Sequence, residues 1–353
     1  MDNLTHSLVG AAIGQAGLKR KSGLAMPALI IGANVPDVDA SCYLWLSGAE
    51  PLAFRRGITH GPIAWIVLPI LVAGLLWAWD RWQTRRGTRP QARLPVHFGW
   101  LYALTLLACL THPALDWLNS YGIRLLEPFS SRWFYGNILF IIDIWLWLLL
   151  GGAVFLSLRR EKRGGKWRRP ARGALALGLA YIGVNAAITA HAEDRADALV
   201  RHGYDVQPDL VVATPVPLAW WSRELLWRVE VPSRSGTAIA YGDGSFSISG
   251  GAELLDPPDA GTTRSITLDD PARARSYVRA RSFLVRNDEL TCWLRTDPNV
   301  APFLFWSRMP VVEEQAGEPD RLIDQRFADP RVSSSFSVTL PRDCGEPRAG
   351  RGA

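Results

Sequence analysis

The first 192 residues contain a series of apolar segments that are almost free of charge. Residues 61–79, 96–112 and 173–192 hold no Asp, Glu, Lys or Arg, and residues 138–158 hold a single charge, Asp143. A helix needs about 20 mainly apolar residues to cross a bilayer. A soluble protein can bury one such helix in its core, but a succession of them predicts an integral membrane protein.

Two further segments near the N-terminus are apolar but less regular. Residues 24–46 are apolar apart from Asn34, Asp37 and Asp39, and residues 4–18 are short and rich in Gly and Ala. Small residues allow membrane helices to pack closely. We therefore expect an α-helical bundle with about six spans, of which the first is either a complete crossing or a re-entrant helix.

Basic residues are divided unevenly between the connecting loops. Residues 19–21, 80–95 and 159–172 together hold sixteen Lys and Arg. The two loops that alternate with them hold four, namely Arg55, Arg56, Arg124 and Arg132. Basic loops stay in the cytoplasm, so this asymmetry places the N-terminus and everything after residue 192 outside. The net charge of +6 reflects this orientation, and no basic face of a soluble domain indicates a nucleic-acid partner.

From about Glu193 the chain is polar, with Pro and Gly between short alternating runs. Such runs predict half-buried strands, and they occur at residues 237–241, 245–248, 282–285 and 335–340. About 150 residues can form one core. The sequence therefore predicts a transmembrane domain over residues 1–192 and a mainly β extracytoplasmic domain over residues 193–353. Cys292 and Cys344 both fall in the second domain, where either a disulfide or two separate thiols fit the sequence.

Ionisable residues collect at one side of the predicted bundle. Three of the six histidines, His6, His60 and His112, follow a Thr, and two acids, Asp37 and Asp39, lie within an apolar segment. With the basic loops inside, all five fall in the outer half of the membrane. Imidazole and carboxylate groups are the usual ligands of zinc and similar metals, and ionisable groups at membrane depth mark functional sites. The pattern predicts one shared metal site.

Two further acids belong to this pattern. Asp116 follows His112 by four residues, so a helix would place both on one face, where the carboxylate could bind metal or orient the imidazole. Asp143 lies in an apolar segment and is expected to face the bundle interior, as a ligand, a partner of a ligand or a partner of Arg132. The alternatives are interfacial histidines and solvated acids at helix ends.

The same residues resemble a known family. The motifs are LTHS at residues 4–7, PDVD at residues 36–39, RGITH at residues 56–60 and THPALD at residues 111–116. In this order they resemble the YdjM-like family of LexA-regulated, predicted membrane-bound metal-dependent hydrolases. The resemblance covers roughly residues 1–158 and is looser at Trp306 and residues 323–327. One departure is Gly61, where the family usually has Ser.

The preferred interpretation is a metal-dependent hydrolase of the bacterial inner membrane, with its site open to the outside. The candidate ligands of a divalent ion, Zn²⁺ first and Mn²⁺ or Mg²⁺ as alternatives, are His6, Asp37, Asp39, His60, His112 and Asp116. The ion would activate a water, with Asp39 or Asp116 as general base and Arg56 as a clamp for phosphate oxygens. Six candidates also allow a two-metal centre.

A site at the lipid interface favours an ester or phosphoester of a lipid-like substrate, and the expected partners are that substrate and membrane lipids. One alternative is a transporter of metal ions or small solutes. The candidate residues lie on one side of the membrane instead of at several depths, which favours the enzyme. The other alternative is a membrane anchor in which a metal is purely structural.

Overall fold

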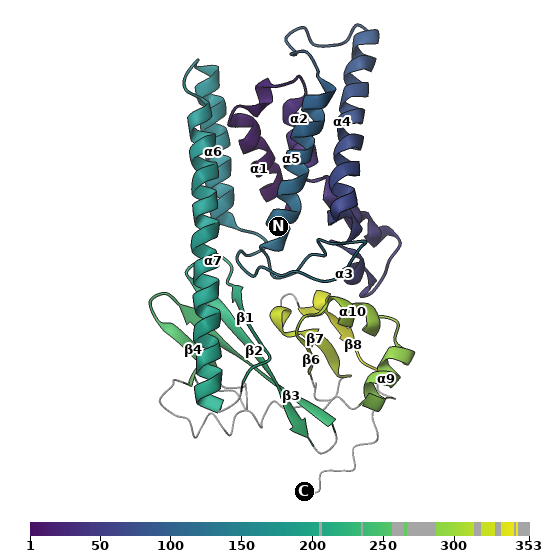
Figure 1. Cartoon of the computed structure of the whole chain (residues 1–353), viewed down its shortest axis with the longest axis vertical. Helices are drawn as coiled ribbons and strands as arrows, with labels where there is room; N and C mark the ends of the chain where they lie inside the picture. Colours follow the sequence, from purple (N-terminus) through teal and green to yellow (C-terminus); the bar gives the residue numbers. More distant parts are fainter. Residues whose placement is uncertain are drawn as a thin grey trace. The chain divides into compact units, whose positions relative to one another are not determined.

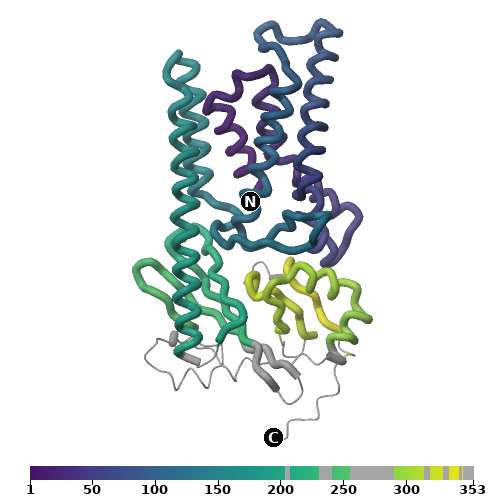
Figure 2. The backbone as a smooth tube through the Cα atoms, viewed as in Figure 1, coloured from purple at the N-terminus to yellow at the C-terminus, as the bar shows by residue number. Residues whose placement is uncertain are grey.

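The computed structural model (Figures 1 and 2) describes residues 1–204, 207–233, 236–255, 265–266, 287–313, 319–328, 333–341 and 344. The chain forms two compact units. Unit 1 comprises Met1–Ser41, Arg56–Ala187 and Pro215–Trp220, and unit 2 comprises Cys42–Arg55, Ile188–Thr214 and Trp221–Ala353. The chain passes from unit 1 to unit 2 between Ala187 and Ile188, and the domain boundary at residue 192 stays a prediction.

The first 204 residues are mainly helical, except for residues 118–143, where Ile123 and Phe134 form an isolated β-bridge. The elements are α1 (Asn3–Gln15), η1 (Leu18–Arg20), α2 (Ala25–Gly32), η2 (Val35–Leu44), α3 (Glu50–Phe54), η3 (Ile58–His60), α4 (Pro62–Arg85), α5 (Phe98–Trp117), α6 (Ile144–Lys162) and α7 (Arg168–Tyr204). In unit 1, α5 packs against both α2 and α4, and α1 packs between α2 and α6 (Figure 1).

Three helices in the described part of the chain are long and apolar enough to cross a membrane, and these are α4, α5 and α7. The surface of α4 is itself apolar, with exposed side chains at Ile63, Ile66, Val67, Ile70, Leu71 and Leu75. A helix in water would expose polar side chains on its outer face, so this face suits contact with lipid. The chain is therefore a membrane protein, and six crossings stay a prediction.

Residues 24–46 do not form one continuous helix. The α2 helix has 8 residues and ends at Gly32, and the chain then continues as the 3₁₀ helix η2 with Asp37 and Asp39. Pro36 lacks the amide that would continue an α-helix, and Asn34 Nδ2 donates 2.8 Å to Ile30 O at the end of α2. Eight residues span about 12 Å, so α2 alone is too short to cross about 30 Å of hydrocarbon.

Glycine allows α1 and α2 to approach closely, as predicted for the Gly-rich N-terminal segment. A Cβ atom on Gly10 of α1 would lie 2.6 Å from the carbonyl oxygen of Leu29 in α2. At the C-terminal end of α2, a Cβ atom on Gly32 would lie 2.9 Å from the carbonyl oxygen of Thr105 in α5. These contacts hold α2 against α5, so that η2, which follows α2, begins beside the C-terminal half of α5.

Asp143 caps a helix, so the apolar segment at residues 138–158 is not one continuous helix that contains it. The α6 helix begins at Ile144, with Asp143 as its N-cap. One carboxylate oxygen accepts from Leu146 N at 2.9 Å, and the other accepts from Tyr181 Oη at 3.0 Å. A carboxylate at the N-cap satisfies an amide that has no partner within the helix. Asp143 therefore anchors the start of α6 and binds it to α7.

The chain after residue 204 is mainly β within its described residues. A five-stranded sheet has the order β1 (Leu210–Pro215), β2 (Ser222–Ser233), β3 (Gly236–Ser247), β4 (Gly251–Leu255) and β5 (Ser265–Ile266). A three-stranded antiparallel sheet has the order β6 (Pro310–Glu313), β7 (Arg321–Asp324) and β8 (Ser337–Thr339). Two helices that the sequence did not predict, α9 (Asn287–Thr296) and α10 (Val300–Trp306), precede the smaller sheet.

Two of the four predicted strands are confirmed as extended chain, but they form one continuous strand instead of two. Residues 237–241 and nearly all of residues 245–248 lie in β3, which pairs with β2 as an antiparallel hairpin. Residues 335–340 are only partly extended, because a 3₁₀ turn, η5 (Ser333–Phe336), comes before β8. The strand predicted at residues 282–285 lies outside the described residues.

Unit 2 is held together by two polar features. Cys292 and Cys344 form a disulfide with a Cα–Cα distance of 5.6 Å, which is one of the two alternatives that the sequence left open. Asp324 and Arg326 form a buried ion pair, with Nε–Oδ1 and Nη2–Oδ2 distances of 2.8 Å. Burial raises the pKa of Asp324, but the Arg326 charge and the hydrogen bonds from Arg326 and Ser307 together outweigh burial, and the pKa lies below its ordinary value. The pair is therefore ionised at neutral pH.

Candidate metal centre

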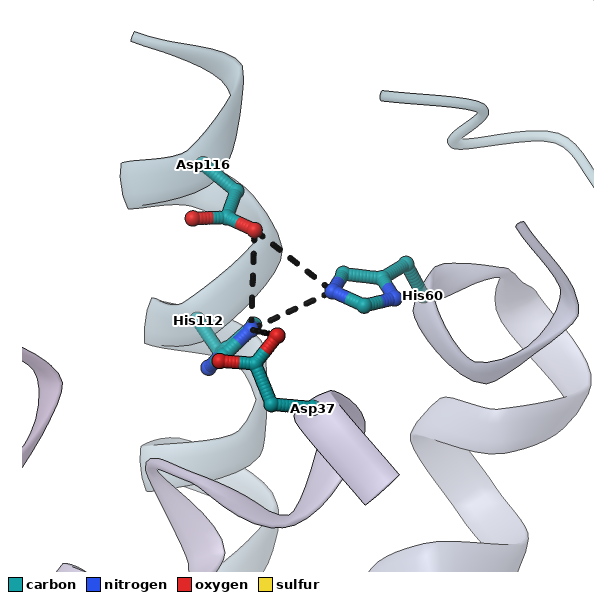
Figure 3. Close-up of side chains that lie close together, drawn as sticks. All are labelled: Asp37, His60, His112 and Asp116. Carbon is teal, nitrogen blue, oxygen red and sulfur yellow. Dashed lines mark hydrogen bonds and ion pairs between the residues drawn. The ribbon is translucent and has the colours of Figure 1, made fainter. Parts of the chain in front are cut away.

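Four side chains from three separate segments of unit 1 converge on one point (Figure 3). Asp37 comes from η2, His60 from the end of η3, and His112 and Asp116 from the C-terminal part of α5. One nitrogen or oxygen atom of each lies within 4.8 Å of the corresponding atoms of the other three. The side chains of His60, His112 and Asp116 are 0–1% exposed, and that of Asp37 is 8% exposed.

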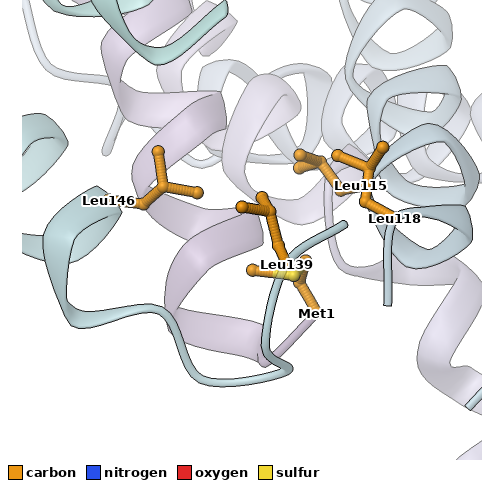
Figure 4. Packing of buried hydrophobic residues seen from close by; sticks show 5 residues of the cluster. All are labelled: Met1, Leu115, Leu118, Leu139 and Leu146. Atoms are coloured by element: carbon orange, nitrogen blue, oxygen red, sulfur yellow. The ribbon is translucent and has the colours of Figure 1, made fainter. Parts of the chain in front are cut away.

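The packing of α5 determines where the side chains of His112 and Asp116 point. His112 and Asp116 are four residues apart and share one face of α5, as predicted. Leu115 and Leu118 pack against Leu139 and Leu146 in a separate apolar cluster (Figure 4). The leucine contacts fix the rotation of the last turns of α5, because turning that end would move the leucines out of their packing.

The separations within the group match those of atoms around a single ion. The two Nε2 atoms of His60 and His112 are 3.2 Å apart, and Asp116 Oδ2 lies 3.5 Å and 3.6 Å from them. Asp37 Oδ1 lies 3.7 Å from His112 Nε2. Bonds of about 2.0–2.1 Å from zinc to nitrogen or oxygen place tetrahedral neighbours about 3.4 Å apart. The residues present therefore fit a zinc ion, and their nitrogen and oxygen atoms also suit related divalent metals.

The charge of the surrounding side chains also fits a divalent cation. Asp37, Asp39 and Asp116 contribute three carboxylates, and Arg56, which pairs with Asp116 at 2.9 Å, contributes one guanidinium. The amino group of Met1 also contacts Asp116, so with neutral imidazoles this group of charges keeps a net negative charge. Buried charge is costly unless it is compensated, and one divalent cation would supply the compensation.

His112 is oriented by a backbone carbonyl. Its Nδ1 atom lies 2.7 Å from the carbonyl oxygen of Ala33, just after α2. A carbonyl oxygen only accepts, so Nδ1 donates, and Nε2 of a neutral ring keeps its lone pair. Nε2 is also the atom that faces His60, Asp37 and Asp116. This is the usual arrangement of a metal-binding histidine, whose other nitrogen donates to a fixed acceptor.

The predicted candidate His6 lies on the other side of Asp116. Its Nε2 atom is 3.3 Å from Asp116 Oδ1, which the amino group of Met1 also contacts, whereas the converging group uses Asp116 Oδ2. The His6 ring stacks on His112, with centroids 3.8 Å apart and an interplanar angle of 19°. His6 therefore lies against two members of the group and is not one of the four converging residues.

Asp39 and Arg56 are not among the four converging residues, but they contact members of that group. Asp39 Oδ2 accepts from Arg56 N at 2.7 Å and lies 3.5 Å from Nδ1 of His60, the nitrogen that points away from the group. Arg56 is 3% exposed. Its Nε atom binds Asp116 Oδ2 at 2.9 Å, and its Nη1 atom donates 2.8 Å to Asn119 Oδ1. In this arrangement the guanidinium orients Asp116, and its predicted contact with a substrate phosphate stays a prediction.

Comparison with known proteins supports the resemblance seen in the motifs. A model of the YdjM inner membrane protein family matches residues 1–192, which include all of the residues of the candidate metal centre and its surroundings. The chain belongs to the YdjM family. The uncharacterized protein YfhP of Bacillus subtilis (strain 168) is 30% identical over 141 residues, which is 38% of this chain and 39% of YfhP. The match thus spans well under half the length of that relative. No solved structure matches the chain.

The structure accounts for the departure at Gly61 from the Ser that the resemblance to the YdjM family implied. A Cβ atom on Gly61 would lie 2.0 Å from the carbonyl oxygen of Glu127, so this backbone leaves no room for a side chain. No motif in the sequence singles out Asn119, whose Oδ1 also accepts from Tyr121 N at 2.9 Å. Its only signal is its place three residues after Asp116.

Proposed function

We propose that this YdjM family protein is a metal-dependent hydrolase that cleaves an ester or phosphoester of a lipid-like substrate. The proposal rests on the convergence of two imidazole nitrogens and two carboxylate oxygens at the spacing of donors around one ion. A bound divalent cation, with Zn²⁺ the best fit and Mn²⁺ or Mg²⁺ as alternatives, would supply Lewis-acid activation of water.

The chain's own residues would orient the reacting groups. His60, His112 and Asp116 are fixed by buried contacts, and Asp37 is the most exposed of the four, so a substrate would enter past Asp37. In this proposal an oxygen of Asp37 accepts the proton of the attacking water, a role that the sequence assigned to Asp39 or Asp116. Both of those carboxylates instead accept from Arg56.

Apolar side chains beside the group favour an amphiphilic substrate. Val38 follows Asp37, Ile58 comes just before His60, and Trp117 follows Asp116. Val38 and Ile58 are each 54% exposed, and Trp117 is 41% exposed. Apolar surface around a polar centre would bind the hydrocarbon part of a lipid while its polar head reaches the four residues.

We expect the metal centre and the chain after α7 to be on the outer side of the inner membrane. The sixteen-to-four division of basic loop residues supports this orientation, as does the Cys292–Cys344 disulfide, since such bonds persist in oxidising compartments. Reporter fusions after Arg163 and after Gly203 should give signals from opposite compartments. Equal signals from the two fusions would contradict the orientation.

One observation favours a second candidate, a membrane anchor with a structural metal. The centre offers four protein donors and is almost completely buried, and closed four-ligand zinc sites are usually structural, whereas catalytic sites keep a position for water. Both candidates predict that the protein binds a metal ion, and only the hydrolase predicts turnover of a substrate.

The test is hydrolysis by purified full-length protein with lipid extracts and with generic ester and phosphoester substrates. Activity should be lost on treatment with a chelator and return when a divalent metal is added back. The His97→Ala variant serves as the control, because His97 is exposed at the opposite end of α5 and its loss should leave turnover unchanged. Metal binding without turnover on any ester or phosphoester would favour the anchor.

A further inference from the structure

The three Thr-His pairs of the chain use their threonine hydroxyls differently. Thr5 Oγ1 bonds to Asp2, and Thr111 Oγ1 donates 2.6 Å to Ala108 O within α5. Thr59 Oγ1 instead lies between a carboxylate and the ring of its own histidine, 3.0 Å from Asp39 Oδ2 and 2.9 Å from His60 Nδ1. A link of this kind between a carboxylate and a candidate metal-binding imidazole occurs only in this one of the three pairs.

The direction of the hydrogen bonds follows from the chemistry of the groups. An ionised carboxylate only accepts, and a hydroxyl has one proton to donate. Thr59 therefore donates to Asp39, and its oxygen accepts from Nδ1–H of His60. With the proton on Nδ1, the Nε2 atom of a neutral ring carries a lone pair, and Nε2 is the atom 3.2 Å from His112 Nε2.

The segment that holds Thr59 and His60 is fixed at its other end by the same carboxylate. Asp39 Oδ2 accepts from the backbone amide of Arg56 at 2.7 Å. Arg56 has a φ of 54°, in the left-handed region that non-glycine residues seldom adopt, and its carbonyl oxygen accepts from Arg124 N at 2.9 Å. Asp39 is 4% exposed, and a buried charged hydrogen bond is strong.

We propose that Asp39 and Thr59 are positioning residues, which fix the ring orientation and the tautomer of His60 so that Nε2 can bind a divalent cation. Asp39 acts through the Thr59 hydroxyl and is not itself a ligand. The proposal rests on the metal centre proposed above and adds the means by which one of its ligands is prepared. Groups that orient a metal-binding histidine in this way typically contribute a factor of about 10–100 to metal affinity.

The first test measures Zn²⁺ affinity of the full-length protein by competition with a chelator. Thr59→Val and Thr59→Ala remove the hydroxyl and should each weaken binding by about 10–100-fold, whereas Thr59→Ser keeps it and should bind as the wild type does. Thr111→Val is the matched control, because the Thr111 hydroxyl donates to a carbonyl of its own helix, and its affinity should not change. Unchanged affinity in both Thr59→Ala and Thr59→Val would overturn the proposal.

A second measurement examines the hydrogen bonds that join Asp39, Thr59 and His60 in the metal-free protein. Nitrogen-15 NMR of histidine-labelled, metal-free protein should show His60 protonated at Nδ1 in the wild type and in Thr59→Ser, and a shift toward protonation at Nε2 in Thr59→Ala. Protonation at Nε2 in the wild type would overturn the positioning role even if zinc binds. The expected tautomer together with a wild type that binds no divalent metal would leave the link standing and refute the metal centre.

Discussion

Replacing His112 by Ala should abolish binding of a divalent metal ion while the protein still inserts into the membrane. His112 Nε2 lies within 3.7 Å of an atom of each of His60, Asp37 and Asp116, so its loss removes the donor that all the others surround. The loss of affinity should exceed the roughly 10–100-fold cost of removing a residue that only orients a ligand. His60→Ala and Asp37→Ala should behave in the same way, although the three residues lie far apart in the sequence.

Metal content of the purified variants, measured by elemental analysis, tests this prediction. His97→Ala is the matched control, since it removes an exposed imidazole at the other end of the same helix and should retain the wild-type metal content. Wild-type occupancy in both His112→Ala and Asp37→Ala would show that these residues share no site, whatever happened to activity.

Replacing Arg56 is expected to lower the stability of the folded protein strongly. Asp116 is 1% exposed and receives the Arg56 Nε atom at 2.9 Å, so Arg56→Ala would leave a buried carboxylate without its guanidinium. Removing one partner of a buried ion pair costs about 3–5 kcal/mol. Arg56→Lys should recover only part of this stability, because an ammonium group cannot reach Asp116 and Asn119 with the fixed geometry of a guanidinium.

Unfolding of the metal-free protein in detergent measures this cost. Arg132→Ala is the control, because Arg132 is exposed and lies over the Phe134 ring, and surface substitutions of this kind usually change stability by less than about 0.5 kcal/mol. Equal stability of Arg56→Ala and Arg132→Ala would mean that Asp116 does not depend on the guanidinium.

The long apolar helices could be predicted from the sequence because their signal is local. The uncharged runs at residues 61–79 and 96–112 became α4 and α5, and the spacing of His112 and Asp116 was enough to place both on one face. Residues 24–46 have the same average character but are interrupted at Pro36. Composition shows that such a segment is apolar, and it does not show that α2 ends at Gly32.

The sequence could not show which polar residues converge on the metal centre and which only contact its members, because this depends on contacts between distant segments. The sequence grouped His6, Asp39 and Arg56 with the four residues that converge. Only the fold shows that Asp39 faces Nδ1 of His60 and that His6 contacts Oδ1 of Asp116. The helices α9 and α10 were missed for a different reason, since they have only 10 and 7 residues.

X-ray absorption spectroscopy of the zinc-loaded, full-length protein tests the proposed donor set most directly. The account predicts nitrogen and oxygen neighbours at about 2.0–2.2 Å, with the outer scattering of imidazole rings, and no sulfur neighbour at about 2.3 Å. A sulfur neighbour would place the ion at a cysteine, such as the buried thiols Cys42 and Cys109. That result, or a spectrum without imidazole scattering, would contradict a metal centre built from Asp37, His60, His112 and Asp116.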